Sequence, residues 1–99
     1  MHPLVPEIRR RSADREFLLS LLKGLNRRGP GVTFAVLLDN LHCFTGFQPL
    51  IARALSKYLI RCFRSSRPNL HCWRIFRELL RLKIADKDAL ACAAVARQH

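Results

Sequence analysis

The stretch FQPLIARALSKYLIRCFR, residues 47–64, decides the fold that we expect for this chain. Its apolar side chains recur at the spacing of an amphipathic helix. The apolar face of this helix comprises Ile51, Leu55, Tyr58, Leu59 and Cys62. The opposite face, within an arc of about 80°, comprises Arg53, Lys57, Arg61 and Arg64. The stretch therefore predicts a surface helix with a basic outer side.

Two helices are expected before this stretch. The leucine spacing in SADREFLLSLLKGLNRR, residues 12–28, predicts one helix, which Ser12 or Asp14 can cap. The apolar run VTFAVLL predicts a second helix over about residues 33–43. A run this short is also compatible with a buried strand, but no convincing second strand is available to pair with it.

Two more helices are expected after residue 64. Residues 69–83 have helical spacing that buries one side and exposes the other. The side expected to be buried comprises Trp73, Phe76, Leu79 and Leu80, and the side expected to be exposed comprises Arg74, Arg77 and Arg81. A last, alanine-rich helix is expected to begin near Asp86 and to end near Ala96.

The N-terminal residues 1–11 contain two prolines and then the triplet Arg9, Arg10 and Arg11, and they predict an irregular basic arm. The remainder, residues 12–99, is predicted to form a single domain, because 99 residues suffice for one core only. The expected fold is all-α, an array of four to five short helices with a basic face.

One short string occurs twice, as NLHCF at residues 40–44 and NLHCW at residues 69–73. The first copy runs into Thr45-Gly46 and is expected to end a helix, whereas the second is expected to begin one. Stacked repeats normally need about three units or more. We therefore interpret the repetition as coincidence or as an eroded echo, with Leu41, Phe44, Leu70 and Trp73 as core anchors.

Basic residues dominate the composition, with 18 Lys and Arg against 7 Asp and Glu, for a net charge of +11. A folded domain this basic repels itself, and a polyanionic partner is the simplest explanation of such a surface. An arginine-rich genome would also raise the Arg content, but it would not explain the shortage of carboxylates. The charge therefore favours nucleic acid as partner, ahead of an anionic membrane or an acidic protein.

The chain carries no recognisable signal for secretion, because residues 1–11 have prolines and charges where a long apolar core is required. Residues 31–52 are the best candidate for a membrane span, but Asp39 and His42 interrupt too short an apolar run. We therefore expect an intracellular protein with no transmembrane segment. Its four cysteines are expected to be reduced thiols, with Cys62 and Cys92 as small buried residues.

Catalytic and metal-binding patterns are scarce. The pairs His42-Cys43 and His71-Cys72 suggest zinc, but adjacent helical residues point about 100° apart and cannot easily share one ion. We expect no metal and no cofactor. Asp39 is the one carboxylate placed for acid–base work beside a histidine, and such an Asp more often faces solvent. We therefore do not expect an enzyme.

The leading hypothesis is a small basic protein that binds DNA or RNA, mainly through phosphate contacts from an arginine-rich helical face. A regulatory role is part of this hypothesis. The expected contacts are Arg53, Lys57, Arg61 and Arg64 on one helix, then Arg74, Arg77 and Arg81 if the next helix packs alongside, and Arg9, Arg10 and Arg11 as a flexible clamp.

The alternative is a small helical interaction module, an adaptor or inhibitor, that docks a basic and apolar face on an acidic protein partner. An exposed apolar surface of this kind would also allow a homo-oligomer. A third hypothesis is a membrane-surface bundle, because residues 49–63 form a basic amphipathic helix. The segments around Gly46 also resemble a helix-turn-helix in outline, which would direct Gln48, Arg53, Ser56 and Lys57 toward a major groove.

Overall fold

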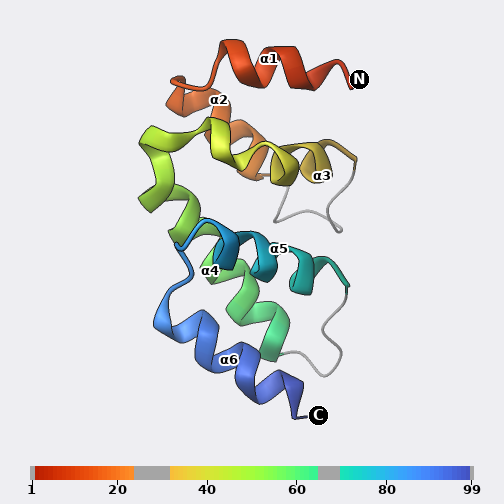
Figure 1. Ribbon diagram of the computed structural model, residues 1–99, viewed down its shortest axis with the longest axis vertical. Coiled ribbons are helices and arrows are strands. Elements are labelled where there is room, and N and C mark those ends of the chain that lie inside the picture. The colour runs from red at the N-terminus through yellow and green to blue at the C-terminus, as the bar shows by residue number, and fades with distance from the viewer. Residues whose placement is uncertain (1, 24–31, 65–69, 99) are drawn as a thin grey trace. The chain divides into compact units, whose positions relative to one another are not determined.

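The computed structural model describes residues 2–23, 32–64 and 70–98 of the chain (Figure 1). Six α-helices and two 3-10 turns are found in these residues, and no β-strand occurs among them. The predicted all-α class is confirmed, with more helices than the four to five expected. Packing of the backbone divides the chain into two compact units, Met1–Gln48 (unit 1) and Pro49–His99 (unit 2). Each is described by itself, and the single domain expected over residues 12–99 stays a prediction.

Unit 1 begins with a helix where an irregular arm was expected: α1 spans Leu4–Arg10. The prediction was wrong because proline was taken to break a helix here. Pro3 stands at the N-cap and Pro6 lies in the first turn, where the backbone N–H that proline lacks has no acceptor within the helix. Ile8 is fully buried and anchors α1.

Helix α2 spans Arg15–Leu22 and begins as the sequence predicted. The Asp14 carboxylate accepts a hydrogen bond from the backbone N–H of Phe17 at 3.1 Å, which satisfies one of the donors left over at a helix start. Phe17 and Leu18 face the core. The C-terminal part of the helix expected over residues 12–28 lies outside the described residues.

Helix α3 spans Val32–Asp39 and packs against both α1 and α2. It is a helix and not a strand, but it ends four residues before the predicted Cys43. The Asn40 side chain is responsible for this end, because its Nδ2 donates to the Val36 carbonyl at 2.8 Å. Two 3-10 turns follow, η2 at Leu41–Cys43 and η3 at Thr45–Phe47.

The core of unit 1 draws on every one of its α-helices. Its fully or almost fully buried side chains are Ile8, Phe17, Leu18, Leu22, Phe34, Leu37, Leu38, Leu41 and Phe44. The rings of Phe17 and Phe44 lie 6.4 Å apart between centroids and join α2 to the segment that follows η2.

Unit 2 is built on α4, which spans Gln48–Arg64 and matches its prediction within one residue. Pro49 lies in the first turn, where its fixed φ suits a helix. Ile51, Leu55 and Leu59 are fully buried, so the predicted apolar face is confirmed. Tyr58 and Cys62, at the edge of that face, are half-buried.

Helix α5 spans Leu70–Arg81 and ends in a left-handed turn at Lys83, whose φ is 61°. The N–H groups of Lys83 and Ile84 donate to the carbonyls of Leu80 and Leu79, each at 3.0 Å, which closes the helix end in the manner of a Schellman motif. The chain then enters α6, Lys87–Arg97, which Asp86 caps by accepting the Ala89 N–H at 2.7 Å.

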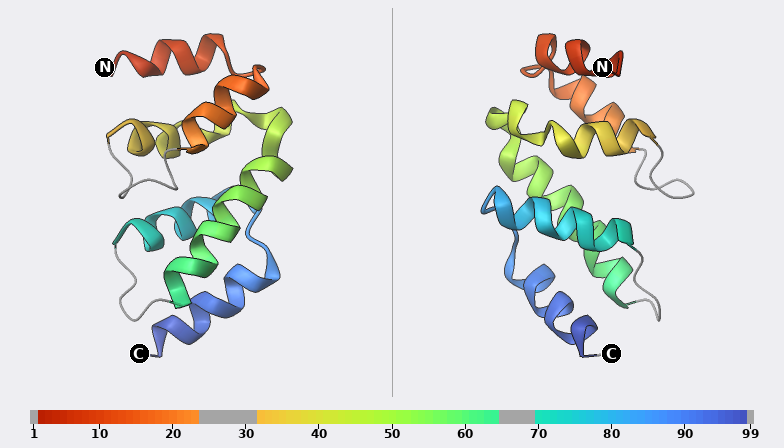
Figure 2. Two further views of the ribbon diagram at one scale, coloured as in Figure 1. Left: turned by 180° about the vertical axis from the view of Figure 1, so that it is seen from behind. Right: turned by 45° about the vertical axis from the view of Figure 1, so that its right-hand side comes forward.

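Aromatic side chains hold α4 and α5 together, and Figure 2 shows α5 crossing α4 obliquely. Phe63 of α4 lies 4.8 Å from Trp73 and 5.9 Å from Phe76 of α5, measured between ring centroids. Ala89 and Ala93 of α6 are also buried, and their small size suits a close helix approach.

The two copies of the repeated string occupy different environments. Leu41 is 1% exposed in η2, whereas Leu70 is 86% exposed at the start of α5. Phe44 is fully buried, whereas Trp73 is half-buried. The prediction that Leu70 anchors the core was therefore wrong, and the copies do not behave as one duplicated unit.

Candidate nucleic-acid interface

The outer side of α4 is a row of exposed cations, which we call the α4 basic face. It comprises Arg53, Lys57, Arg61 and Arg64, all of them exposed. The row exists because the four residues follow one another at intervals of three and four, while the apolar residues between them point to the core. The solvent exposure expected from the sequence is confirmed for these four side chains.

No carboxylate occurs anywhere in the 17 residues of α4. Within the part of the chain that the structure describes, no ion pair involves Arg53, Lys57 or Arg64. The positive charge of Arg61 lies close enough to Tyr58 to favour the ionised form of the Tyr58 hydroxyl, and by itself it lowers the pKa of that group. The positive charge of α4 is thus carried on one side of one helix, with no acidic residue of that helix to offset it.

Tyr58 marks the border between the α4 basic face and the core. Burial, with a hydrogen bond between its hydroxyl and the Cys62 thiol, raises the pKa of Tyr58 to about 12. The nearby charge of Arg61 opposes this rise only in part. Tyr58 is therefore neutral at physiological pH, and it adds no negative charge beside the basic face.

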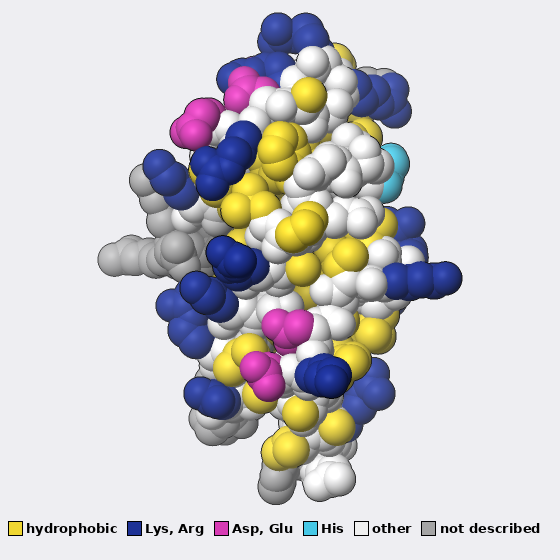
Figure 3. All heavy atoms as spheres, turned by 90° about the vertical axis from the view of Figure 1, so that its left-hand side faces the viewer, with side chains coloured by type: hydrophobic (Ala, Val, Ile, Leu, Met, Phe, Trp, Pro, Cys, Tyr) yellow, Lys and Arg dark blue, Asp and Glu magenta, His cyan; other side chains and the backbone are white. Residues whose placement is uncertain are grey.

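The second predicted row, on α5, does not extend the first. The side chains of Cys72, Ile75 and Leu79 are buried, and helical geometry directs the arginines of α5 away from them. The buried sides of α4 and α5 meet at Phe63 and Phe76, so the two basic rows point away from each other. The lower part of the face drawn in Figure 3 shows Lys and Arg side chains along both margins, with apolar and acidic side chains among those that lie between them.

The arginines of α5 also differ in their local partners. Arg81 donates to the Glu78 carboxylate at 2.7 Å, which is an ion pair one turn along the helix. Arg77 is exposed, and Arg74 is half-buried. The condition for a continuous ridge was that the two helices pack side by side, and it is not met because α5 crosses α4 obliquely.

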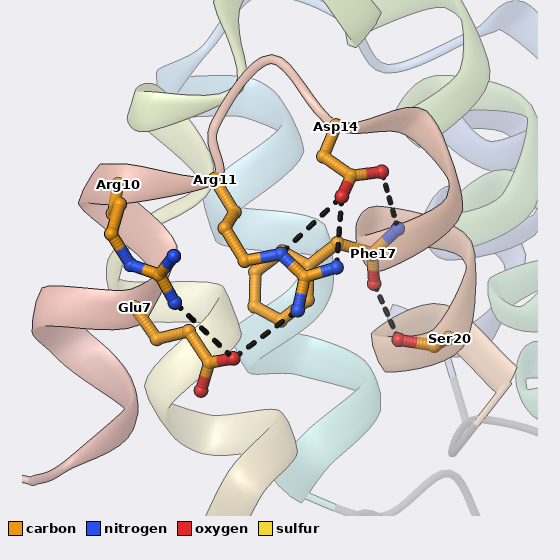
Figure 4. Close-up of polar contacts among 6 residues, drawn as sticks. All are labelled: Glu7, Arg10, Arg11, Asp14, Phe17 and Ser20. Carbon is orange, nitrogen blue, oxygen red and sulfur yellow. Dashed lines mark hydrogen bonds and ion pairs between the residues drawn. The ribbon is translucent and has the colours of Figure 1, made fainter.

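The arginine triplet of unit 1 is not a flexible clamp (Figure 4). Arg9 and Arg10 lie in the last turn of α1. The Arg11 guanidinium is held by Asp14 at 2.8 Å and by Glu7 at 3.2 Å, and it lies 4.3 Å from the centroid of the Phe17 ring. The Asp14 contact raises the pKa of Arg11, and the Arg11 guanidinium lowers the pKa of Asp14. Arg11 thus joins α1 to α2.

The resemblance to a helix-turn-helix that the sequence suggested is wrong in two respects. Eight residues, 40–47, separate α3 from α4 and form two 3-10 turns, whereas that motif uses a turn of three or four residues. Ser56, expected to face a major groove, is 1% exposed and lies in the core. Its Oγ atom has no hydrogen-bond partner among the described residues.

The groups considered for catalysis and metal binding do not line the hollow found beside α5 among the described residues. Asp39 and His42 are both exposed. No disulfide joins the four cysteines, all of which belong to the described residues. Cys62 and Cys92, expected to be buried, are half-buried. Among the residues described here, no three or more His, Cys, Asp or Glu side chains gather closely enough to hold a metal ion.

One feature of unit 2 was not predicted from the sequence. A hollow of about 470 Å³ lies beside α5, and Leu70, Trp73 and Arg97 are among the residues that line it. The Arg97 guanidinium lies 5.5 Å from the centroid of Trp73 and 5.7 Å from that of Phe76. The heptad spacing of Leu70, Trp73 and Leu80 could have indicated this hollow, but all three residues were predicted to lie in the core.

Comparisons with known protein families, with curated proteins and with solved structures find no match to this chain. In the described part of the chain, every helix is too short or too polar to span a membrane.

Proposed function

We propose that this protein binds nucleic acid through the α4 basic face, mainly by contacts with phosphate oxygens. The observation that carries the proposal is a 17-residue helix with four exposed cations and no carboxylate. Arginine and lysine so arranged release condensed counterions when they meet a phosphate backbone, which is the main source of affinity in non-specific binding.

The dimensions of α4 suit a short run of phosphates. Arg53 and Arg64 are eleven residues apart, which corresponds to about 16 Å along a helix. Adjacent phosphates of one DNA strand are separated by about 3.4 Å along the axis of the duplex. The α4 basic face can therefore span several phosphates of one strand without bending.

The residues proposed as phosphate ligands are Arg53, Lys57, Arg61 and Arg64. Arg11 is left out, because Glu7 and Asp14 already hold its guanidinium. Arg81 is left out for the same reason, because it is paired with Glu78. An arginine that leaves its carboxylate for a phosphate exchanges one charged contact for another. It therefore adds little to the net affinity for nucleic acid.

The test compares two triple variants with the same loss of charge. One replaces Arg53, Lys57 and Arg64 by Gln, and the other replaces Arg9, Arg10 and Arg15 of unit 1 by Gln. Fluorescence anisotropy with duplex DNA, duplex RNA and single-stranded RNA at low salt measures the affinity of each. The α4 variant should lose about a hundredfold in affinity, whereas the unit 1 variant should lose much less.

Circular dichroism of both variants checks that the helices remain. Equal losses in the two variants would mean that binding follows net charge only, and the α4 basic face would no longer be the site. A native protein that binds none of the three probes at low salt would overturn the proposal altogether.

A further inference from the structure

Helix α5 presents a second kind of surface to solvent, in which large apolar side chains accompany arginine. Leu70 is 86% exposed and Leu80 is 44% exposed, and both lie beside Trp73 on the side of α5 that is not buried. Together with Trp73 and Arg77 they recur at i, i+3, i+7 and i+10, which is the spacing of a coiled-coil seam. These four side chains fall within about 80° of arc.

The hollow of about 470 Å³ lies along this seam. Phe76, which is 4% exposed, lines it together with Trp73, and the centroids of the two rings are 6.2 Å apart. The Arg97 guanidinium of α6 lies over both rings and forms one wall. The residues Leu70, Trp73, Phe76, Arg77, Leu80 and Arg97 define what we call the α5 groove.

We propose that the α5 groove docks an acidic amphipathic helix of a partner protein. A seam of exposed and half-buried side chains at heptad spacing fits the apolar stripe of a second helix, as in other helix-in-groove complexes. From Leu70 to Leu80 the seam extends about 15 Å, which corresponds to about three turns of the docked helix. The hollow then receives one large apolar side chain of that helix.

Charge complementarity indicates that the partner is acidic. Arginines are the charged residues around the hollow, and none of the described residues that line it is acidic. The nearest carboxylate along α5, that of Glu78, is 12% exposed and is held by Arg81. Arg77 occupies a core position of the seam, where a polar residue fixes register by requiring a matching partner. A glutamate or aspartate on the docked helix would supply that match.

Other occupants fit less well. A second copy of this chain would bring Arg77 and Arg97 of the two grooves together, and like charges in an interface are costly. An unpaired nucleobase would need an open aromatic face, but Arg97 already covers Trp73 and Phe76. The exposed leucines also offer no hydrogen bonds to the edge of a base.

Trp73 provides a direct measurement, because it is the single tryptophan of the chain and it lies in the groove. The probe is a synthetic helical peptide with leucine on its apolar stripe, glutamate on both flanks and neither tryptophan nor tyrosine. A second peptide replaces each glutamate by glutamine. The glutamate peptide should shift the Trp73 emission to the blue in a saturable titration, and it should bind more tightly than the glutamine peptide.

Variants then locate the contact. Leu70→Ser combined with Leu80→Ser should weaken peptide binding by about tenfold or more, because two leucines lose their burial. Val95→Ser is the matched control, since Val95 is 58% exposed on α6 but does not line the hollow. Arg77→Glu should weaken binding of the glutamate peptide more than that of the glutamine peptide.

Three results would overturn the proposal: equal affinity for the two peptides, unchanged affinity in the double leucine variant, or a Trp73 response to oligonucleotides or anionic vesicles but to neither peptide. The proposal stands independently of the nucleic-acid proposal. Replacing the cations of the α4 basic face should leave peptide binding unchanged, and the double leucine variant should leave duplex binding unchanged. The two proposals can therefore fail separately.

Discussion

Two segments of this chain, the junction of α1 with α2 and helix α4, treat arginine in opposite ways. In unit 1, two carboxylates hold Arg11, at 3.2 Å from Glu7 and 2.8 Å from Asp14. In unit 2, α4 carries its arginines with no carboxylate in the helix. A net charge of +11 therefore does not describe the surface by itself. What distinguishes these two segments is whether a carboxylate stands three or four residues from the arginine on the same helix or turn, as Glu78 also does for Arg81 of unit 2.

The contrast extends to polar groups without charge. In unit 1, the Ser20 hydroxyl donates to the Phe17 carbonyl at 2.6 Å. In unit 2, the Ser56 hydroxyl is buried without a partner among the described residues. The serine of unit 1 thus has a local acceptor, whereas the buried serine of unit 2 is unsatisfied.

Neutralising the two carboxylates that hold Arg11 should make the junction of α1 with α2 resemble α4, and among the variants that compare these segments it should have the largest effect. Glu7→Gln with Asp14→Asn removes both partners of Arg11, and asparagine still caps α2. Duplex affinity should rise about tenfold at low salt as the guanidinium becomes available to phosphate. Anisotropy measures the rise.

The matched control, Asp86→Asn with Asp88→Asn, changes the charge equally in unit 2 and should give a smaller rise. Equal rises would show that local pairing has no influence on binding.

Two N-caps permit a comparison of stability. Asp86→Ala should lower the free energy of unfolding by about 1 kcal/mol, the usual loss for an aspartate cap. Asp14→Ala should cost more, because Asp14 caps α2 and also holds Arg11. Urea titrations followed by circular dichroism measure both.

The two cap variants should also differ in their dependence on pH. The pKa of Asp14 is lowered in the folded protein, mainly by Arg11. The corresponding stabilisation is present above the ordinary pKa of an aspartate, and it is lost as the pH falls through the lowered value. The gap between the two variants should therefore close in acid. A gap that persists at low pH would contradict a contribution from the ionised carboxylate.

Removing the unpartnered hydroxyl of unit 2 should increase stability. Ser56→Ala should raise the free energy of unfolding by about 1 kcal/mol, because a buried hydroxyl without a partner is costly and alanine favours a helix. Ser20→Ala, which removes a satisfied and exposed hydroxyl, should raise it less. Thermal unfolding compares the two. A loss of stability in Ser56→Ala would indicate that the hydroxyl has a partner in solution.

The smallest expected effect concerns Tyr58, the single tyrosine. Its phenolate absorbance should titrate with a midpoint near the raised pKa of about 12, above the ordinary value of about 10. Because the folded-state pKa is raised, the associated stability is complete below the ordinary pKa and is lost as the pH rises toward the folded value. Cys62→Ala should move the midpoint down. A native midpoint at the ordinary value would contradict the burial of this side chain.

Much of the fold could be predicted because helical periodicity is a strong signal in long segments. The bounds of α4 were accurate within one residue, since its apolar and basic positions alternate without interruption. The end of α3 could not be predicted from periodicity, because it depends on one side-chain bond from Asn40 to the Val36 carbonyl. The prolines before α1 were misread because their effect depends on the position within the first turn.

The candidate site was predictable in part. The exposure of Arg53, Lys57 and Arg64 follows from their place opposite the apolar face. The pairing of Glu7 with Arg11 depends on the i, i+4 spacing of a helix. It was not predicted, because residues 1–11 were expected to form an irregular arm. The crossing of α4 and α5 is a tertiary property set by Phe63, Trp73 and Phe76, and no local pattern encodes it.

The salt dependence of duplex binding tests the central claim most directly. The logarithm of affinity should fall linearly with the logarithm of salt concentration, with a slope of about 0.9 for each phosphate contacted. Replacing Arg53, Lys57 and Arg64 by Gln should reduce that slope by about 2.7. The unit 1 variant, with Arg9, Arg10 and Arg15 replaced, should keep the native slope. An unchanged slope in the α4 variant, with a reduced slope in the unit 1 variant, would contradict the account.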